Sequence, residues 1–238
     1  KSGDTVYHSG NSAMPRALIR ALATRQNELS DVTVVHLLLL GDYPLGAPGT
    51  ERAFRHKSLF IGSADRVAVN EGRSEYIPVM LHQVPRLYRE RHIPLDVAMI
   101  MVSPPDEHGF MSFGVETIAT RAACESAKVV IAQVNPKMPR VLGDAFIHIG
   151  RVHHVVEHEE PLVSLEAHTI SEIESRIGQN VRTLIPDGAT LQLGIGGIPD
   201  AVLANLDGLR DLGIHTEMVS DGAMRAIDRW SLCISGDA

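Results

Sequence analysis

The sequence is poor in aromatic residues, in cysteine and in long hydrophobic runs. Phe, Tyr and Trp make up 4% of its 238 residues, so aliphatic side chains must build the core, which favours α/β packing over an aromatic-rich β-sandwich. Two cysteines are too few for the disulfide framework of a small secreted protein, so we expect a reducing compartment, the cytoplasm or, in a eukaryotic source, the mitochondrion. The apolar runs around 34–40 and 97–102 are shorter than the ~20 residues of a membrane span, so no membrane partner is expected.

An excess of basic residues is also missing. There are 29 Asp and Glu against 22 Lys and Arg, which gives a net charge of −7. Nucleic acid is therefore not an expected partner, because its binding needs a concentrated basic surface. An acidic protein can still bind a small anion, since the backbone N–H groups at the start of a helix form a local positive site.

Four segments are predicted to be buried strands of a parallel sheet, because each is a nearly continuous aliphatic run that ends in turn-forming residues. These segments are Val32–Leu40, Asp96–Val102, Lys128–Val134 and Ala189–Leu193. Helical patterns lie between them, for example at Pro15–Gln26 and Val115–Ser126. Strands that alternate with helices predict a doubly wound, mostly parallel α/β sheet.

Two segments share the order strand, glycine-containing turn and helix with proline at its start. The first runs from Ser2 to Leu22 and the second from Asp187 to Leu206, and one deletion in the turn aligns Pro15 with Pro199. Proline is tolerated in the first helical turn because its missing N–H would have no acceptor there. The repeat indicates an internal duplication, with a first domain at 1–184 and the beginning of a second, similar domain at 185–238.

The spacing of the two copies also predicts that the sequence is incomplete. A repeat unit of roughly 185 residues would place the end of the second domain near residue ~370. The sequence is therefore expected to be a fragment or a truncated product. Its last residues, 230–238, show no periodic pattern and are not expected to form a native element.

The turn of the second copy, Gly194-Ile195-Gly196-Gly197-Ile198, is the first candidate site. A strand leads into glycines that open a helix, so the backbone can approach a ligand and the first N–H groups are free to bind it. The motif alone supports an anion cradle or oxyanion hole no better than a tight turn that needs glycine for its backbone angles. It is not a dinucleotide-binding fingerprint, because Pro199-Asp200 follows where a third glycine is required.

The second candidate is Glu217. Residues 213–222 follow the helix of the second copy and are predicted to continue as a strand, with His215, Glu217 and Val219 on one face. Glu217 would then lie near the carboxyl end of the strand, beside the glycine turn, at the edge where open α/β sheets bind ligands. A glutamate at a strand end more often only reaches solvent, and the pattern by itself favours that interpretation.

Three further motifs carry weaker signals. The loop Ser103–Gly114 either binds substrate or is a structural turn. His154-Val155-Val156-Glu157-His158 fits the H-x-x-E-H spacing of zinc peptidases, but Gly150 and Pro161 leave little room for the required helix, so an extended segment without metal is expected. Ser9-Gly10-Asn11-Ser12 lacks the G-x-S-x-G elbow, so a nucleophilic serine is not expected.

The glycine turn, followed by His215-Thr216-Glu217-Met218-Val219-Ser220-Asp221-Gly222, resembles the acetyl-CoA hydrolase/transferase family. Within that family the sequence is most similar to the 4-hydroxybutyrate and butyrate:acetate CoA-transferases. Segments of the first half agree with the same pattern: Ser103–Gly109, Val130–Arg140 and Ile147-His148. The resemblance extends to about Asp228, and the pair of motifs shifts the interpretation of Glu217 toward function.

The resemblance implies an enzyme with two similar α/β domains, usually a homodimer, that transfers CoA from a short-chain acyl-CoA to a carboxylate such as acetate. It implies that Glu217 is the catalytic nucleophile, which forms an acyl-glutamyl anhydride and then a glutamyl-CoA thioester, and that Gly194–Ile198 contacts CoA. No metal or redox cofactor is expected beyond CoA as a substrate. An acyl-CoA (acetyl-CoA) hydrolase and a truncated, non-catalytic chain that pairs with full-length subunits are the alternatives.

Overall fold

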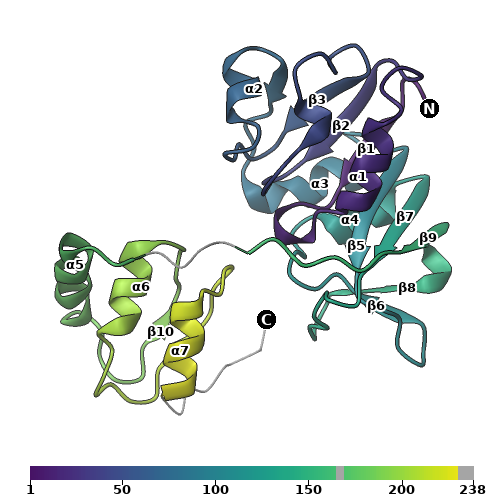
Figure 1. Ribbon diagram of the computed structural model, residues 1–238. Helices are drawn as coiled ribbons and strands as arrows, with labels where there is room; N and C mark the ends of the chain where they lie inside the picture. The colour runs from purple at the N-terminus through teal and green to yellow at the C-terminus, as the bar shows by residue number, and fades with distance from the viewer. Residues whose placement is uncertain (165–168, 230–238) are drawn as a thin grey trace. The chain divides into compact units, whose positions relative to one another are not determined.

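The computed structural model describes residues 1–164 and 169–229. The chain forms two compact units, Lys1–Ser164 and Leu165–Ala238, which are described one at a time (Figure 1). In the described part of both units, no helix has the length and apolar character needed to cross a membrane. The segment 230–238, for which no native element is expected, lies outside the described residues.

The first unit is built on a seven-stranded sheet in which every neighbouring pair is parallel. In spatial order its strands are β4 (Ser74–Tyr76), β3 (Phe54–Ser58), β2 (Val32–His36), β1 (Thr5–His8), β5 (Val97–Val102), β7 (Val129–Val134) and β9 (His154–Glu157). The chain runs outward from β1 to β4 and then returns to the other side of β1. This reversal defines a doubly wound α/β sheet, as predicted.

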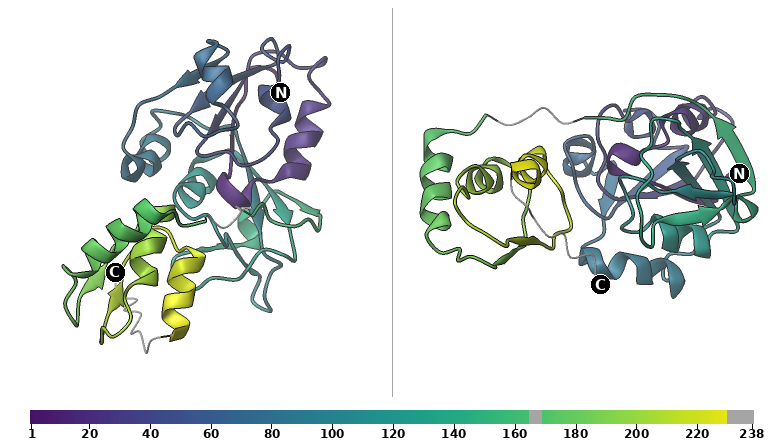
Figure 2. Two further views of the ribbon diagram at one scale, coloured as in Figure 1. Left: turned by 60° about the vertical axis from the view of Figure 1, so that its left-hand side comes forward. Right: turned by 90° about the horizontal axis from the view of Figure 1, so that it is seen from below.

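Helices cover both faces of this sheet (Figure 1, Figure 2). They are α1 (Arg16–Ala23), α2 (Arg66–Asn70), α3 (Val84–Arg89) and α4 (Thr120–Ser126), with single 3₁₀ turns η1 (Asn11–Ala13), η2 (Pro44–Gly46), η3 (Leu81–Gln83) and η4 (Ile149–Arg151). Successive residues of the central strands alternate between two cores: Val6, Val34 and Met99 pack in the core that includes α1, whereas Tyr7, Val35 and Ile100 pack in the core that includes α3 and α4. Burial on both faces explains why these strands are continuous aliphatic runs.

A small antiparallel ladder, β6 (Phe110–Ser112) with β8 (Phe146–His148), is separate from the main sheet.

Two of the predicted elements of the first unit, a strand and a helix, are shorter than expected. The strand predicted to reach Leu40 ends at His36. Two residues further on, the carbonyl of Leu38 accepts the N–H of Asn11. The helix predicted from Val115 starts at Thr120, and the residues before it form a turn in which the Glu116 carboxylate accepts the Ile118 N–H and the Thr120 hydroxyl.

Three histidines are buried on adjacent strands of the first unit: His8 on β1, His36 on β2 and His56 on β3. The rings of His8 and His36 stack with centroids 5.6 Å apart. The Tyr43 hydroxyl lies 2.9 Å from His8 Nε2 and 3.5 Å from His56 Nδ1, whereas His36 Nε2 has no hydrogen-bond partner. Burial makes such a cluster costly to protonate.

The second unit contains α5 (Glu172–Arg182), β10 (Thr190–Leu191), α6 (Gly197–Ala204), β11 (Gly213–Ile214) and α7 (Asp221–Arg229). A capping box at Ser171 and Glu174 begins α5. A Cβ added at Gly178 would lie 2.6 Å from the backbone of Ala201, so α5 and α6 pack closely there (Figure 2). The second unit includes α5 and therefore begins before residue 185, where the internal repeat placed the boundary.

The two repeated segments have the same order of elements. Both β1 and β10 lead through a glycine-containing turn into a helix, and each strand pairs in parallel with the next strand along the chain. Their prolines are offset, because Pro15 is the N-cap residue before α1 whereas Pro199 is the third residue of α6. The first turn also contains η1, which has no counterpart in the second. The common order fits the predicted duplication.

Candidate functional site

The glycine turn and the glutamate segment leave the same edge of the second unit. β10 and β11 are parallel neighbours, with Thr190 opposite Gly213 and Leu191 opposite Ile214. Since the carboxyl ends of parallel strands meet at one edge, the turn after β10 and the segment after β11 start side by side. The N–H of His215 donates to the Leu191 carbonyl at 3.0 Å and continues this alignment just beyond the ladder.

A threonine side chain then joins the two segments. The Thr216 hydroxyl donates to the Leu193 carbonyl at 2.6 Å and accepts the Leu193 N–H at 3.1 Å. It thereby satisfies both backbone groups of the residue that precedes the glycine turn. Thr216 also precedes Glu217, so this pair of bonds fixes the start of the glutamate segment against the start of the turn.

The strand predicted across Glu217 is wrong, because β11 ends at Ile214. In a continuing parallel ladder the Leu193 N–H would bond to the backbone of the neighbouring strand, but here the Thr216 side chain takes that bond. The alternation of exposure survives without the ladder. His215, Glu217 and Val219 are exposed, as expected of one face, while Thr216 and the residues between them are partly buried.

The far end of the glutamate segment is tied to α6. The Ser220 hydroxyl donates to Asp200 Oδ1 at 2.8 Å and accepts the Ala223 N–H at 3.3 Å, so it also caps α7. A Cβ at Gly222 would lie 2.5 Å from Asp200 Oδ1, so a side chain at this position would displace the Asp200 carboxylate. Glu217 therefore stands in a short segment held at both ends. Sequence reasoning assigned no role to Thr216, Ser220 or Asp200, although the hydroxyl residues that flank Glu217 were a usable signal.

The glycine turn has the properties of an anion site. Gly196 has φ of +114°, a conformation that side chains rarely adopt, and no atom lies within 4 Å of where its Cβ would be. Within the described residues, the backbone N–H groups from Gly194 to Ile198 donate to no protein acceptor. Unpaired N–H groups at the start of α6 favour an anionic ligand. The side chains of Ile195 and Ile198 are 52% and 46% exposed, which leaves an accessible apolar rim.

Glu217 is exposed and makes no hydrogen bond or ion pair with residues 1–164 or 169–229. A carboxylate with no partner keeps its lone pairs available for attack on an electrophilic carbonyl. Oxygen charge that develops during such an attack could be stabilised by free backbone N–H groups. The structure thus brings the two predicted candidates, Glu217 and the turn Gly194–Ile198, to one edge of one sheet.

The candidates of the first unit are structural. Asp106, in the loop Ser103–Gly114, accepts the N–H groups of Phe110 and His108 and pairs with Arg140. These donors hold the pKa of Asp106 below its usual value, with the Phe110 N–H the largest cause. Of the two interpretations of this loop, the contacts support the turn. Ser9 is fully buried, and its hydroxyl donates to the Ala13 carbonyl and accepts the Met101 N–H, so it is not a free nucleophile.

The zinc-like motif is extended, as expected. His154–Glu157 forms strand β9. The histidines of the motif therefore do not have the helical arrangement that zinc peptidases use. Across the described ranges, no group of three or more His, Cys, Asp and Glu side chains has the arrangement of a metal site.

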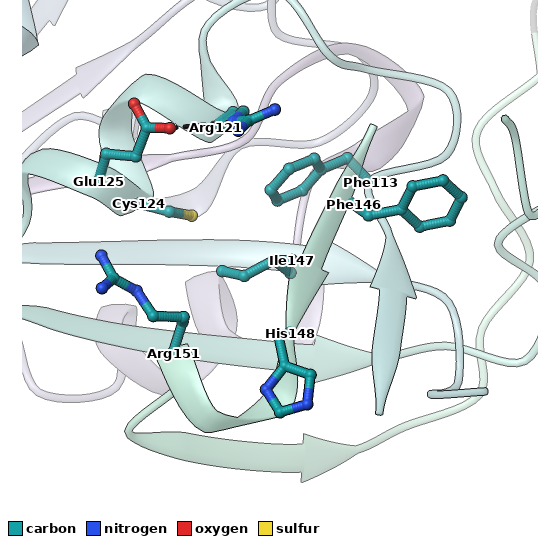
Figure 3. Close-up of a pocket in the computed structure, with 8 residues that line it drawn as sticks. All are labelled: Phe113, Arg121, Cys124, Glu125, Phe146, Ile147, His148 and Arg151. Atoms are coloured by element: carbon teal, nitrogen blue, oxygen red, sulfur yellow. Dashed lines mark hydrogen bonds and ion pairs between the residues drawn. The ribbon is translucent and has the colours of Figure 1, made fainter. Parts of the chain in front are cut away.

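The first unit also carries a pocket of about 230 Å³ between α4, the β6–β8 ladder and η4 (Figure 3). Its lining residues are Phe113, Arg121, Cys124, Glu125, Phe146, Ile147, His148 and Arg151. Arg121 is engaged by Glu125 at 2.9 Å, and Glu125 also accepts from Arg89. The volume is below the ~300–1,000 Å³ of common small-molecule sites. Phe113, from the loop Ser103–Gly114, lines it, but neither Glu217 nor the turn Gly194–Ile198 does. It is therefore not the site that the sequence predicts.

Comparison with known proteins identifies the family. A family model described as the acetyl-CoA hydrolase/transferase N-terminal domain matches residues 1–166. The 4-hydroxybutyrate coenzyme A transferase of Clostridium kluyveri is 46% identical over 90% of this chain and 50% of that protein. The butyryl-CoA:acetate CoA-transferase of Anaerostipes caccae is 35% identical over 97% of this chain and 56% of that protein.

Solved structures agree with these matches. A 4-hydroxybutyrate CoA-transferase from Porphyromonas gingivalis superposes with a TM-score of 0.82 at 41% identity, over 98% of this chain and 54% of that one. RipA from Yersinia pestis superposes with a TM-score of 0.89 at 32% identity, over 97% of this chain and 56% of that one. The chain spans about half the length of the curated relatives it matches.

Proposed function

The chain belongs to the acetyl-CoA hydrolase/transferase family, and on that premise we propose that it carries the catalytic glutamate of a CoA-transferase. The observation that carries the proposal is the placement of Glu217, which is exposed, has no partner in the described residues and stands on a segment that Thr216 ties to the start of the glycine turn. The second unit is, in this proposal, the beginning of a second CoA-transferase domain. The substrates are a short-chain acyl-CoA and a carboxylate such as acetate or 4-hydroxybutyrate, and the working enzyme is a homodimer.

The first half of the reaction loads CoA onto the enzyme. The Glu217 carboxylate attacks the thioester carbonyl of the acyl-CoA, the C–S bond breaks, and CoA leaves as a thiolate while an acyl-glutamyl anhydride forms. The thiolate then attacks the glutamyl carbonyl of the anhydride. The acyl group departs as its carboxylate, and Glu217 is left as a glutamyl-CoA thioester.

The second half reverses these steps with the acceptor. The acceptor carboxylate attacks the glutamyl carbonyl and expels the CoA thiolate, which then attacks the new acyl carbonyl and releases Glu217 as a carboxylate. Every step exchanges a carboxylate and a thiolate at a carbonyl, so nothing is oxidised or reduced. The proposed cycle therefore needs CoA as a substrate and no metal or redox cofactor.

The glycine turn supports the proposal through its unpaired donors. Each attack develops negative charge on a carbonyl oxygen, and preorganised N–H groups stabilise such charge most when water is excluded. The unpaired N–H groups of Gly194–Ile198 supply donors at the edge from which the Glu217 segment departs. We assign this turn to the oxyanion and to contacts with CoA.

A steady-state assay of the full-length protein tests the proposal. Acyl-CoA is supplied with and without acetate, and both acetyl-CoA and free CoA are measured. We expect acetyl-CoA to form only when acetate is present, with little free CoA. Release of free CoA at the same rate with or without acetate would instead identify an acyl-CoA hydrolase. No turnover of either kind would leave the chain as a non-catalytic partner of other subunits.

The intermediate can be trapped in the same protein. With acyl-CoA and no acceptor acid, Glu217 should accumulate as a CoA thioester, which borohydride reduces to an alcohol. Mass spectrometry of the peptide that contains Glu217 then reports the loss of one oxygen and the gain of two hydrogens. Trapping at another residue would contradict the assignment.

A further inference from the structure

The strand β9 leaves one edge of the seven-stranded sheet open. It pairs with β7 on one side and with no described strand on the other (Figure 1). All four of its residues are exposed, with Val155 at 43% and Val156 at 39%. Successive residues of a strand point to opposite faces, so β9 is uncovered on both faces as well as along its edge.

The opposite edge of the sheet is better protected. α2 packs against β4, and Glu75 on β4 pairs with Lys57 on the neighbouring strand at 3.7 Å. Pro78 follows two residues after β4. Helices, charge and proline are means by which proteins block edge strands. β9 has exposed valines at its centre and lacks proline and lysine, so it is the edge open to another strand.

The charges around β9 are ordered along the chain. Arg151 and His153 precede its valines, and Glu157 and Glu159 follow them. Neither Arg151 nor Glu157 forms an ion pair with any other described residue, whereas Glu159 pairs with Lys137 at 3.3 Å. A strand that is basic at one end and acidic at the other complements a second copy of itself only when the two run antiparallel.

We propose that β9 pairs antiparallel with β9 of a second copy of this chain across a two-fold axis, which joins the two sheets into one. Directly opposite residues in an antiparallel pair share the same backbone orientation, so self-pairing must match odd positions with odd and even with even. The register that also satisfies the charges places Val155 opposite Val155 of the second copy and His153 opposite Glu157 of the second copy. Arg151, which lies in the turn η4 and not in the strand, is then at the same end of the pair as Glu159 of the second copy.

The size of the surface sets the expected affinity. A four-residue strand with its flanks covers less than the ~800 Å² per partner of a standard interface. Ile149, which is 39% exposed in the turn η4 before β9, extends it only modestly. We therefore expect a dissociation constant of about 1–100 µM for this chain. The inference specifies the homodimer of the proposed function, but its tests measure association, so either can fail without the other.

A charge-swap experiment on the 238-residue chain tests the pairing. One variant carries Glu157→Lys with Glu159→Lys, and the other carries Arg151→Glu with His153→Glu, whose carboxylate can still accept the Val130 N–H that His153 Nδ1 accepts at 3.0 Å. By sedimentation velocity each variant alone should self-associate at least ~10-fold more weakly than the native chain. An equimolar mixture should recover the dimer, and this recovery excludes misfolding as the cause of the loss.

A cysteine experiment tests the register in a background with Cys233→Ser. Val155→Cys should form an intermolecular disulfide under mild oxidation, because opposite residues bring their Cβ atoms ~4.5–5.5 Å apart. The matched control, Val156→Cys, should cross-link much more slowly, since it faces His154 of the second copy. A native chain that is monomeric up to ~200 µM, charge variants that dimerise as well as the native chain, or equal cross-linking of the two cysteine variants would each overturn the proposal.

Discussion

The Thr216 hydroxyl oxygen lies 2.6 Å from the carbonyl oxygen of Leu193 and 3.1 Å from its amide nitrogen. One side chain therefore replaces two backbone bonds at the point where the ladder between β10 and β11 ends. These two bonds hold the segment of Glu217 against the start of the glycine turn, because Leu193 precedes the turn and Thr216 precedes Glu217.

Thr216→Val should separate positioning from chemistry. The substitution keeps the shape of the side chain but leaves the Leu193 N–H without its partner and the Leu193 carbonyl with only the 3.4 Å bond from Gln192 Nε2. This loss should destabilise the second unit by about 1–3 kcal/mol. In the full-length protein kcat should fall by ~10–100-fold, because small displacements of a nucleophile cost rate. Thr183→Val is the control, since its hydroxyl bonds only to the Asn180 carbonyl at an exposed helix end. Equal kcat in the two variants would contradict the positioning role.

Glu217 variants test the nucleophile. Glu217→Gln keeps size and hydrogen bonding but removes the attacking charge, so the barrier to transfer should rise by roughly 3 kcal/mol or more, about 100-fold in rate. Glu217→Asp keeps the charge and withdraws it by one methylene, and it should also be nearly inactive. Both variants should unfold at the native temperature, because the side chain has no partner in the described residues. Full activity in Glu217→Gln would remove this residue from the mechanism.

Gly196→Val tests the glycine turn. The valine side chain would stand where the backbone approaches the ligand, so CoA affinity in the full-length protein should drop by at least ~10-fold. Strain alone could mimic this result, because Gly196 has φ of +114°. Gly208→Val is the matched control, since Gly208 has φ of +84° and equally open surroundings away from the turn. If isothermal titration gives both variants the same CoA affinity, the turn is only structural.

The histidine cluster predicts acid sensitivity. Burial, followed by repulsion from His36, lowers the pKa of His8 to about 3, and burial, followed by repulsion from His56, lowers the pKa of His36 to about 3. Above pH 6.5 both histidines are neutral whether the chain is folded or not, so they do not affect stability. Between pH 6.5 and 3 only the unfolded chain binds these protons, so each histidine destabilises the fold by ~1.4 kcal/mol per pH unit.

Urea unfolding of the first unit between pH 6 and 4 should therefore show a stability loss of roughly 2.7 kcal/mol per pH unit from this pair. His36→Phe should about halve that slope. A slope that does not respond to His36→Phe would show that other groups govern the acid transition.

The sequence determined the fold class and supplied the candidate site residues. Aliphatic runs such as Val97–Val102 alternate with helical patterns, and both are local properties that need no partner to be recognised. The glycine turn was a candidate from its own residues, whereas the resemblance to the family, and not the local pattern, pointed to a catalytic role for Glu217. His154–Glu157 was expected to be extended because Gly150 and Pro161 confine it, and it forms β9.

Tertiary structure decided what depends on a distant partner. β11 ends at Ile214 because Thr216 bonds to Leu193, 23 residues away in the sequence. A local sequence pattern does not reveal a hydrogen bond between residues so far apart along the chain. Asp200 lies against Gly222, and Arg140 pairs with Asp106, 34 residues away in the sequence. The same holds for His8 and His36, which are ordinary strand residues in the sequence. Their low pKa values arise only when parallel pairing stacks them in a core without water.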